Sequence, residues 1–351
     1  MQLVLRFYQR ALRTPIRVGE VTLAERRGFW IEVSDGGVSL ALAECAPLPG
    51  LHRETLTEAA DLWRRWAAAH REDRVRSLEA GDEQWTPATQ SSLDMLRMSW
   101  NIGQHPERWP LSQHETDRFV PLCGLLHLTP AADQNWWQDL RDLKQAGYQT
   151  IKVKVGRLDR AVELERLSEL RAFMGPQLRL RLDANGRLDA ETAAFWTEAL
   201  RGWPIDYWED PSEDDRIKRL LPWPLARDEI AWGAGTKALS PEDLERVSVL
   251  KPNVIGFRRF VEAMLKASES PKRLVLSNAY ESSLSLHLYA WIYGRCVTVP
   301  EALGFGTQRA FLHDDFPFAA ELKTGRLRWP DQPFFSIKDW PEVTGEEVLW
   351  S

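Results

Sequence analysis

Hydrophobic and polar positions follow one pattern in the first hundred residues and another in the rest of the chain. Apolar side chains recur at about every second position over 2–10 and 14–23, which predicts two strands. The stretch FWIEVSDGGVSLALAE (29–44) predicts an antiparallel hairpin with its turn at Asp-Gly-Gly. A loop rich in proline and glycine then leads into helices predicted over 53–70 and 87–101. The pattern therefore predicts an N-terminal α+β domain over residues 1–100.

From about residue 119, short apolar strands alternate with amphipathic helices. The predicted strands are VPLCGLLHL, TIKVKVG, LRLRLDANG, PIDYWEDP, PLARDE, VSVLKP and RLVLSNAY. The predicted helices are WWQDLRDLKQAGY, the segments near 159–174, 189–201, 241–246 and 257–268, and ESSLSLHLYAWIYG. This spacing is typical of parallel βα units, and seven or eight units predict an α/β fold, a (β/α)7–8 barrel of modified TIM type over 119–305. We expect the N-terminal domain to cap the barrel and the segment 306–351 to pack back on that domain as an appendage.

Composition and charge exclude several classes of protein. The net charge of −6 over 351 residues argues against nucleic-acid binding, which requires a basic surface. No apolar run approaches the roughly 20 residues that span a bilayer, so we expect no membrane partner. The N-terminus lacks the long apolar core of a signal peptide, and the three cysteines lie far apart. These features predict a cytoplasmic protein, either a monomer or a homo-oligomer.

The ends of five consecutive predicted strands carry ionisable residues. These residues lie 19 to 29 positions apart, about one βα unit each, and are Lys154, Asp183, Glu209, Asp228 and Lys251. The carboxyl ends of the strands of a parallel barrel meet at one mouth, where enzymes of this architecture carry out their chemistry. We therefore expect these five side chains to gather there.

The residue types indicate the chemistry. The three acids offer only oxygen ligands, which favour Mg²⁺ over zinc. A lysine lies before and after them, and a cation between two amines suits removal of a proton beside a carboxylate. Lys152 precedes Lys154 by two positions and projects from the same face of the strand. Its charge and partial burial would lower the pKa of Lys154 and make that amine a usable base.

Several motifs together resemble the enolase superfamily, in its muconate-lactonising-enzyme branch. They are the K-x-K of Lys152 and Lys154, the R-x-D-A-N of Arg181 to Asn185, Glu209 before Asp210-Pro211, Asp228-Glu229, and Lys251-Pro252. The resemblance covers nearly the whole chain and implies a barrel with an N-terminal capping domain. It implies Mg²⁺, with Mn²⁺ as a substitute, on the three acids, and roles for Arg181, Asn185 and Glu229 beside substrate or metal.

Two further stretches are similar to the o-succinylbenzoate synthase family of that branch: GFWIEVSDGG…AECAPLPGLHRETLTEA and LSNAYESSLSLHLYA. This similarity implies dehydration of a small carboxylate, 2-succinyl-6-hydroxy-2,4-cyclohexadiene-1-carboxylate, in menaquinone biosynthesis. In the implied roles, Lys154 removes the α-proton, Mg²⁺ stabilises the enediolate, and Lys251 stabilises it from the opposite face. The loop 46–53 would cover the site, and Ser282 and Ser283 would hold the succinyl group.

Two alternatives stay open, and several local features carry less weight. Two opposed lysines suit an N-succinylamino acid racemase or a dipeptide epimerase equally well, and a barrel retained only for binding is the second alternative. GAGTK (233–237) lacks the spacing of a phosphate loop. We expect a surface turn at His313-Asp314-Asp315, a packing or capping role for His287, and a position near the mouth for His127, while Cys123 ends no recognisable nucleophile motif.

Overall fold

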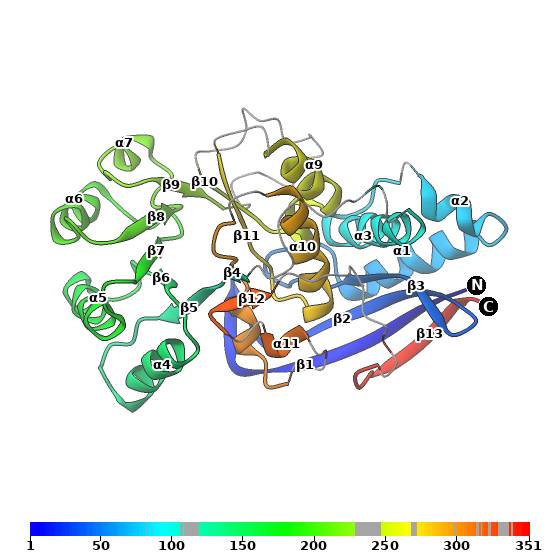
Figure 1. Cartoon of the computed structure of the whole chain (residues 1–351), viewed down its shortest axis with the longest axis horizontal. Coiled ribbons are helices and arrows are strands. Elements are labelled where there is room, and N and C mark those ends of the chain that lie inside the picture. The colour runs from blue at the N-terminus through cyan, green and yellow to red at the C-terminus, as the bar shows by residue number, and fades with distance from the viewer. Residues whose placement is uncertain are drawn as a thin grey trace.

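The computed structural model describes residues 1–81, 83–105, 108, 119–228, 247–267, 272–297, 300–313, 316, 318–321, 324–328, 337 and 340–351. Figure 1 shows an antiparallel sheet with its helices on one side of the molecule and a curved set of parallel strands with theirs on the other. The two parts are joined through the middle of the molecule, where α9 and α10 lie. The predicted fold, a modified TIM barrel with an α+β capping domain, is confirmed.

The capping sheet contains four antiparallel strands. They are β1 (Gln2–Val18), β2 (Val21–Asp35), β3 (Val38–Cys45) and β13 (Gly345–Trp350), in the order β13-β1-β2-β3. The two strands predicted over 2–10 and 14–23 are wrong in detail, because β1 continues from the first range to Val18, the chain turns at Gly19, and β2 begins at Val21. An irregular register with β2 between Ala11 and Ile16 explains the break in the alternating pattern. The hairpin turn at Asp-Gly-Gly is confirmed, with Gly36 and Gly37 both at positive φ.

Three helices belong to the capping domain: α1 (Leu56–Ala69), α2 (Arg74–Glu79) and α3 (Pro87–Gln104). Helix α1 begins at a capping box in which the Thr55 side chain accepts from the Glu58 backbone and Glu58 accepts from the Thr55 backbone. Trp63 and Trp66 of α1 are buried against the sheet and against Trp350 of β13. The short helix α2 was not predicted.

The barrel wall is a seven-stranded parallel sheet in the order β11-β10-β9-β8-β7-β6-β5. Its strands are β5 (Cys123–His127), β6 (Thr150–Lys154), β7 (Arg179–Asp183), β8 (Ile205–Glu209), β9 (Leu225–Arg227), β10 (Val247–Leu250) and β11 (Arg273–Leu276). The extended pair Leu303-Gly304 lies between the two edges of this sheet. Leu303 bridges to Leu122 beside β5 and Gly304 bridges to Ser277 after β11, both in the parallel sense. The barrel is closed by this minimal eighth strand.

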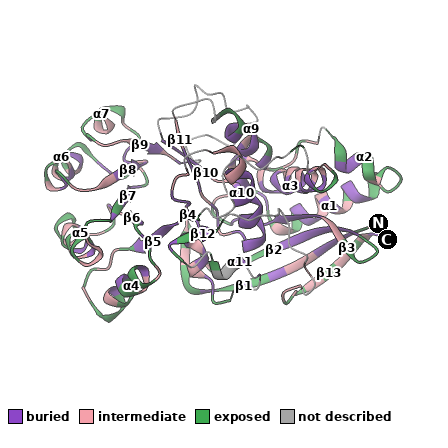
Figure 2. Cartoon of the chain, viewed as in Figure 1, coloured by how far each residue is buried: buried purple, intermediate pink, exposed green. Residues whose placement is uncertain are grey.

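Helices cover the outside of the barrel. They are α4 (Gln134–Gln145), α5 (Arg160–Met174), α6 (Ala190–Ala199), α7 (Asp215–Lys218), α8 (Pro252–Ile255), α9 (Phe257–Ala267) and α10 (Ser283–Cys296). Figure 2 shows buried residues on the inner faces and exposed residues on the outer faces of α4, α5 and α6, while α7 has no buried residue. The helix expected near 241–246 lies outside the described residues. Among the helices that the structure describes, none is long and apolar enough to cross a membrane.

The C-terminal part of the chain contacts both domains. The 3₁₀ helix η4 (Gly306–Ala310) follows the closing strand, and α11 (Phe318–Glu321) lies near α10. Strand β12 (Arg326–Arg328) pairs with β4 (Phe119–Pro121) beside the barrel. Strand β13 pairs with β1 in the capping sheet. The tail therefore stabilises the arrangement of the two domains as well as the capping sheet itself.

Candidate active site

The register of the parallel strands brings the predicted residues to one level of the barrel. Lys154 at the end of β6 pairs with Asp183 at the end of β7, and Asp183 pairs with Glu209 at the end of β8. Lys152 lies two residues before Lys154 on the same face, with its side chain 20% exposed. This confirms that the two lysines share one poorly solvated face of β6.

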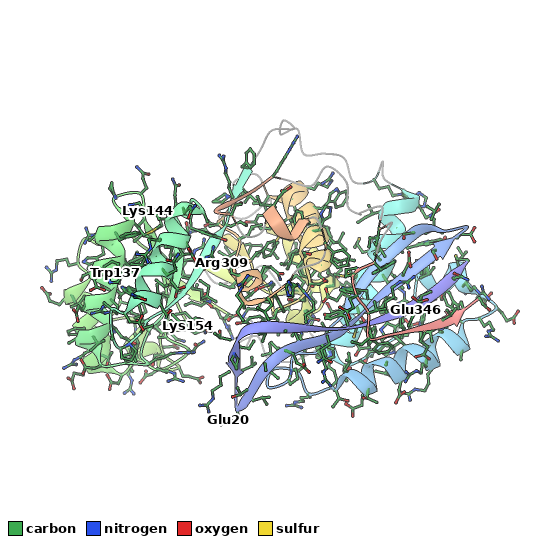
Figure 3. All side chains as sticks on the ribbon, turned by 90° about the horizontal axis from the view of Figure 1, so that it is seen from below. Glu20, Trp137, Lys144, Lys154, Arg309 and Glu346 are labelled. Atoms are coloured by element: carbon green, nitrogen blue, oxygen red, sulfur yellow. The ribbon has the colours of Figure 1, made fainter. Side chains whose placement is uncertain are left out.

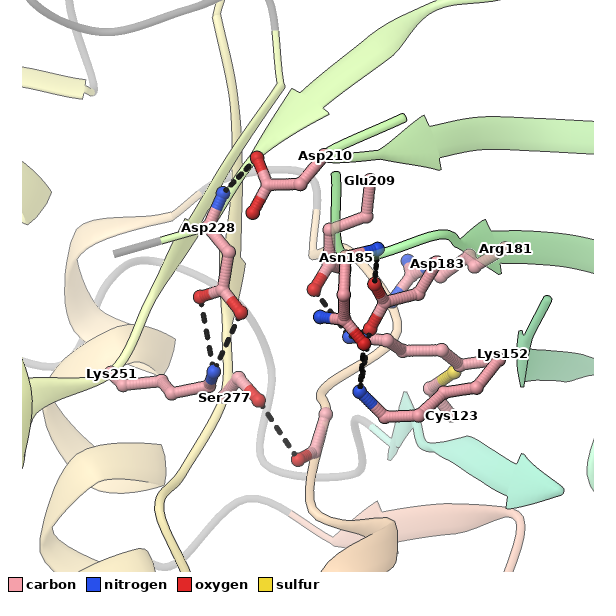
Figure 4. A network of polar contacts seen from close by, with 12 residues as sticks. Cys123, Lys152, Arg181, Asp183, Asn185, Glu209, Asp210, Asp228, Lys251 and Ser277 are labelled. Atoms are coloured by element: carbon pink, nitrogen blue, oxygen red, sulfur yellow. Dashed lines mark hydrogen bonds and ion pairs between the residues drawn. The ribbon is translucent and has the colours of Figure 1, made fainter. Parts of the chain in front are cut away.

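The two β6 lysines contact the same acid. Lys152 Nζ lies 3.0 Å from Asp183 Oδ2 and donates a close hydrogen bond to Glu209 Oε1. Lys154 Nζ lies 3.1 Å from Asp183 Oδ2 and 2.8 Å from Asn185 Oδ1. Figure 4 shows the side chains of Asp183, Asn185 and Glu209 gathered close to Lys152. Lys152 therefore contacts two buried carboxylates, while Lys154 contacts one carboxylate and one side-chain amide.

Lys251 and Asp228 form a second group across the mouth (Figure 4). Lys251 Nζ lies 3.0 Å and 2.8 Å from the two carboxylate oxygens of Asp228. Among the residues described, no three acids, histidines or cysteines lie close enough together to hold a metal ion. The three predicted ligands therefore form two neighbouring groups here instead of one: Asp183 and Glu209 pair with Lys152, and Asp228 pairs with Lys251.

Electrostatics separates the roles of the two β6 lysines. Burial disfavours the charged form of Lys152, but Asp183 and Glu209 outweigh it and raise the pKa of Lys152 well above its ordinary value. Burial lowers the pKa of Lys154, and the nearby Lys152 charge lowers it further against the opposing pull of Asp183. Lys152 therefore stays charged, and Lys154 is the more readily deprotonated amine, as the sequence predicted.

Glu209 has the properties of a metal ligand. Burial, followed by repulsion from Asp183 and Asp228, raises the pKa of Glu209 to about 7. Its Oε2 is buried and accepts no hydrogen bond in the described part of the chain. A buried acid with an unpartnered oxygen beside further acids fits a hard divalent cation. Mg²⁺ would have to displace lysine contacts that these acids make here.

The backbone after β7 and β8 is shaped to turn these side chains toward the mouth. Asn185 adopts a positive φ of 48°, which asparagine tolerates, and its amide oxygen thereby reaches Lys154. Its backbone N–H donates to Asp183 Oδ1 at 3.1 Å. Asp210 also has a positive φ, 39°, and its side chain accepts from the Asp228 backbone at 3.3 Å. The Asp-Ala-Asn turn is thus part of the site.

Arg181 takes a different position from the one expected. Its guanidinium is buried and donates to Asp206 Oδ2 at 2.9 Å and to the Ala302 carbonyl at 2.6 Å. It also lies 3.5 Å from Glu301. Asp206 lies near the start of β8, so Arg181 points toward the amino-terminal end of the barrel, away from the mouth. It closes the base of the barrel and does not contact the site acids.

Ser282, next to Ser283 in the chain, also differs from the expectation. Both are fully buried, and the Ser282 hydroxyl donates to Glu44 Oε2 at 2.7 Å and accepts from Trp30 Nε1 at 3.0 Å. Glu44 of β3 also accepts from the Ser282 backbone at 2.9 Å and from Ser285 at 2.6 Å. Glu44 therefore caps the start of α10 from the other domain. The Ser282 hydroxyl is committed to the contact between the domains, so the structure does not support its contact with substrate.

The remaining candidates are distributed as follows. Glu229, GAGTK (233–237) and Asp314-Asp315 lie outside the described residues. His127 ends β5, is exposed and pairs in register with Lys154, so it reaches the mouth as expected. His287 and Cys123 are buried, in line with packing roles.

Two contacts near the mouth were missed by the sequence analysis. Glu163 of α5 accepts from the backbone N–H groups of Gly156, Arg157 and Leu158 at 2.9 to 3.0 Å, which orders the loop after Lys154. His52 lies 3.0 Å from the Asn253 carbonyl oxygen and joins the loop 46–53 to the segment after Lys251. The His52 contact has no local signal, because it joins residues 201 positions apart that only the fold brings together, whereas Glu163 lies within seven positions of the backbone groups that it binds.

Comparison with known families agrees with this architecture. Residues 137–337 match the family described as Enolase C-terminal domain-like. The match spans more than half of the chain, so the chain belongs to this enzyme family.

Several relatives of similar length are named o-succinylbenzoate synthase. An o-succinylbenzoate synthase of Thermosynechococcus vestitus is 28% identical over 320 residues, 87% of this chain and 92% of the relative. One of Vibrio cholerae is 28% identical over 88% of this chain and 91% of the relative. The crystal structure of the o-succinylbenzoate synthase from Thermosynechococcus elongatus, complexed with Mg in the active site, aligns with a TM-score of 0.60 at 26% identity and covers 90% of this chain and 95% of that one. An N-succinyl Arg/Lys racemase from Bacillus cereus, 14% identical with a TM-score of 0.71 over 99% of both chains, shares the fold.

Proposed function

We propose that the chain catalyses the Mg²⁺-dependent dehydration of 2-succinyl-6-hydroxy-2,4-cyclohexadiene-1-carboxylate to o-succinylbenzoate, as a step of menaquinone biosynthesis. The observation that carries the proposal is that the strands of Lys154 and Lys251 flank the three strands that end in the acids, with Lys154 against Asp183 and Lys251 against Asp228. The relatives named o-succinylbenzoate synthase support the choice of substrate.

Lys154 is the base in this proposal. Its lowered pKa lets it take the proton from the carbon that bears the ring carboxylate. Asn185 and Asp183 hold its Nζ in place from the next strand. The proton that Lys154 acquires then leaves with the ring hydroxyl as water. The elimination balances, since one C–H bond and one C–O bond break while a ring double bond and water form.

The charge that develops on the substrate carboxylate requires a cation. Mg²⁺ bound by Asp183, Glu209 and Asp228 would supply positive charge beside that carboxylate. Lys251 supplies a second positive charge from the β10 side, and Lys152, which stays charged, adds a third from β6. A small-molecule carboxylate is therefore the class of substrate that this charge distribution favours.

A second candidate function uses the same residues. Lys154 and Lys251 approach from opposite sides, which also suits an N-succinylamino acid racemase or a dipeptide epimerase, where one amine removes a proton and the other returns it. Solved racemase and epimerase structures share the fold. A barrel that only binds ligands is disfavoured, because it would have no use for a lysine with a lowered pKa.

The experiment is direct. The purified protein is incubated with Mg²⁺ and the cyclohexadiene substrate, and the aromatic product is followed by its ultraviolet absorbance. In parallel, N-succinylamino acids are incubated in D₂O and deuterium at the α-carbon is measured by NMR. Product in the first assay supports the synthase. Deuterium exchange with no product in the first assay favours the racemase.

A further inference from the structure

Two hydrogen bonds that the proposed chemistry does not use bind the loop 46–53 of the capping domain to the segment after Lys251, and a third within the loop orients His52. His52 Nδ1 accepts from the Leu48 backbone at 2.9 Å, and His52 Nε2 lies 3.0 Å from the Asn253 carbonyl oxygen. Asn253 Nδ2 donates back to the Ala46 carbonyl at 3.0 Å. We call this set the His52–Asn253 clamp.

The clamp specifies one form of the histidine ring. A backbone N–H can only donate, so Nδ1 of His52 must accept from Leu48 and the ring proton lies on Nε2. That proton is then donated to the Asn253 carbonyl. Burial lowers the pKa of His52, which keeps the ring in this neutral form. The ring therefore acts as a rigid connector between two backbone groups of different domains.

Both sides of the clamp are themselves fixed. On the loop side, the buried Arg26 donates to the Pro47 carbonyl at 2.6 Å and also to the Ala46 carbonyl. On the barrel side, Ser91 of α3 donates to the Pro252 carbonyl at 3.0 Å. Asn253 itself is only 3% exposed. Displacement of the clamp would thus move groups that are otherwise held.

The segment that the clamp holds begins at Lys251. The Lys251 carbonyl accepts from the backbone N–H groups of Val254 and Ile255 at 2.9 and 3.1 Å, which forms the single turn of α8. A helix this short has little stability of its own, so contacts from outside must fix its position. The position of α8 in turn sets the backbone from which the Lys251 side chain extends toward Asp228.

We propose that His52 is a positioning residue that sets the Lys251 amine through Asn253 and α8. The inference rests on the proposed function, since it concerns an amine that acts in that reaction. A displacement of about 1 Å at a group that stabilises developing charge is enough to reduce the rate strongly. The capping loop is thereby coupled to one specific catalytic group of the barrel, in addition to covering the mouth.

The experiment compares His52→Phe, His52→Gln and the control His70→Phe in the full chain. His70 packs on Trp66 in the same domain, with its Nδ1 2.8 Å from the Trp66 carbonyl oxygen and its Nε2 3.9 Å from Glu83 Oε1. Two quantities are measured: kcat and KM with Mg²⁺ and the cyclohexadiene substrate, and the rate at which acetic anhydride modifies Lys251 relative to Lys144, by mass spectrometry. The second does not depend on catalysis.

We expect His52→Phe to lower kcat by about tenfold or more with KM within about threefold, because the lost contact matters mainly in the transition state. Acetylation of Lys251 should accelerate, because its ion pair with Asp228 loosens. His52→Gln should keep kcat and the acetylation rate of Lys251 close to those of the parent protein, since the glutamine amide offers one donor and one acceptor. His70→Phe should behave as the parent protein.

Unchanged Lys251 acetylation in His52→Phe would overturn the proposal, whatever the activity. Faster acetylation with unchanged kcat would also overturn it, because the clamp would then order Lys251 without consequence for the reaction. If the parent protein forms no product, the proposed function fails, and the acetylation rates alone decide whether His52 positions Lys251.

Discussion

Lys251 Nζ lies 2.8 Å and 3.0 Å from the two carboxylate oxygens of Asp228, so this amine is held by one of the acids proposed to bind the metal. It therefore adds positive charge at the site from the strand opposite Lys154. Lys251→Ala should lower kcat by about 10²–10³-fold, the usual cost of removing one group that stabilises developing charge. Steady-state kinetics with Mg²⁺ measures this effect.

The control for that variant is Lys144→Ala. Lys144 lies on the outer helix α4 together with Trp137, as Figure 3 shows, and its ammonium contacts the Phe173 carbonyl. Activity of Lys251→Ala within about threefold of the Lys144→Ala value would remove Lys251 from the mechanism.

The second prediction concerns the metal. EDTA should abolish turnover, and Mg²⁺ or Mn²⁺ should restore it. Glu209→Gln keeps the size of the side chain but removes the charge of the acid with the unpartnered oxygen. Its affinity for Mg²⁺, measured by calorimetry, should fall by about tenfold or more. The matched control is Glu191→Gln, whose side chain is 77% exposed. Equal Mg²⁺ affinity in the two variants would contradict the assignment of Glu209 as a ligand.

The third prediction concerns the contact between the domains. Glu44→Ala removes the acceptor of the Ser282 backbone and of the Ser282 and Ser285 hydroxyls, all of which remain buried. Leaving buried donors unpaired should cost about 3 kcal/mol or more of unfolding free energy, measured in urea. Glu20→Ala, at the hairpin end labelled in Figure 3, should cost less than about 0.5 kcal/mol. Similar losses in the two variants would contradict the role of Glu44.

The fourth prediction concerns pH. Burial, and then the Glu44 charge, raise the pKa of Glu281 to about 7, against about 4.3 in an unfolded chain. The folded state therefore binds this proton more tightly, and its contribution to stability is complete below about pH 4.3 and lost as pH rises through about 7. The contribution is at most roughly 4 kcal/mol, since the two pKa values differ by about 2.7 steps of about 1.4 kcal/mol each.

Glu281→Gln should remove this part of the pH dependence while keeping an acceptor for the Ala279 backbone. Urea unfolding at about pH 5.5 and pH 8 tests it: between these values the parent protein should lose more stability than the variant. An equal loss of unfolding free energy in the parent protein and in Glu281→Gln would show that Glu281 does not titrate in this range.

The fold could be predicted from the sequence because its determinants are periodic and local. The βα alternation and the charges at the strand ends, such as Asp183 and Glu209, depend only on the spacing of units along the chain. The closing strand Leu303-Gly304 could not be predicted in this way, because two residues are too few to show an alternating pattern of apolar and polar positions. The sequence pattern divided the continuous strand β1 into two predicted strands, because its register with β2 is irregular between Ala11 and Ile16.

The residues that act from the end of their own strand could be predicted from the sequence. The contacts between the two domains could not. Lys152 and Lys154 follow from the strand period and their like charges. Ser282 was assigned to substrate because nothing in its neighbourhood along the chain reveals Glu44, which is 238 positions away. His52 and Asn253, 201 positions apart, were missed for the same reason.

The central claim is that Lys154 acts as base at a site held by the ends of consecutive strands, and one comparison tests it most directly. The parent protein and Lys154→Ala are incubated with Mg²⁺ and the cyclohexadiene substrate, and the aromatic product is followed by absorbance. We predict rapid product formation by the parent protein and none by Lys154→Ala, with unchanged circular dichroism and Mg²⁺ affinity. Equal rates in the two proteins, or no product from either, would contradict the account.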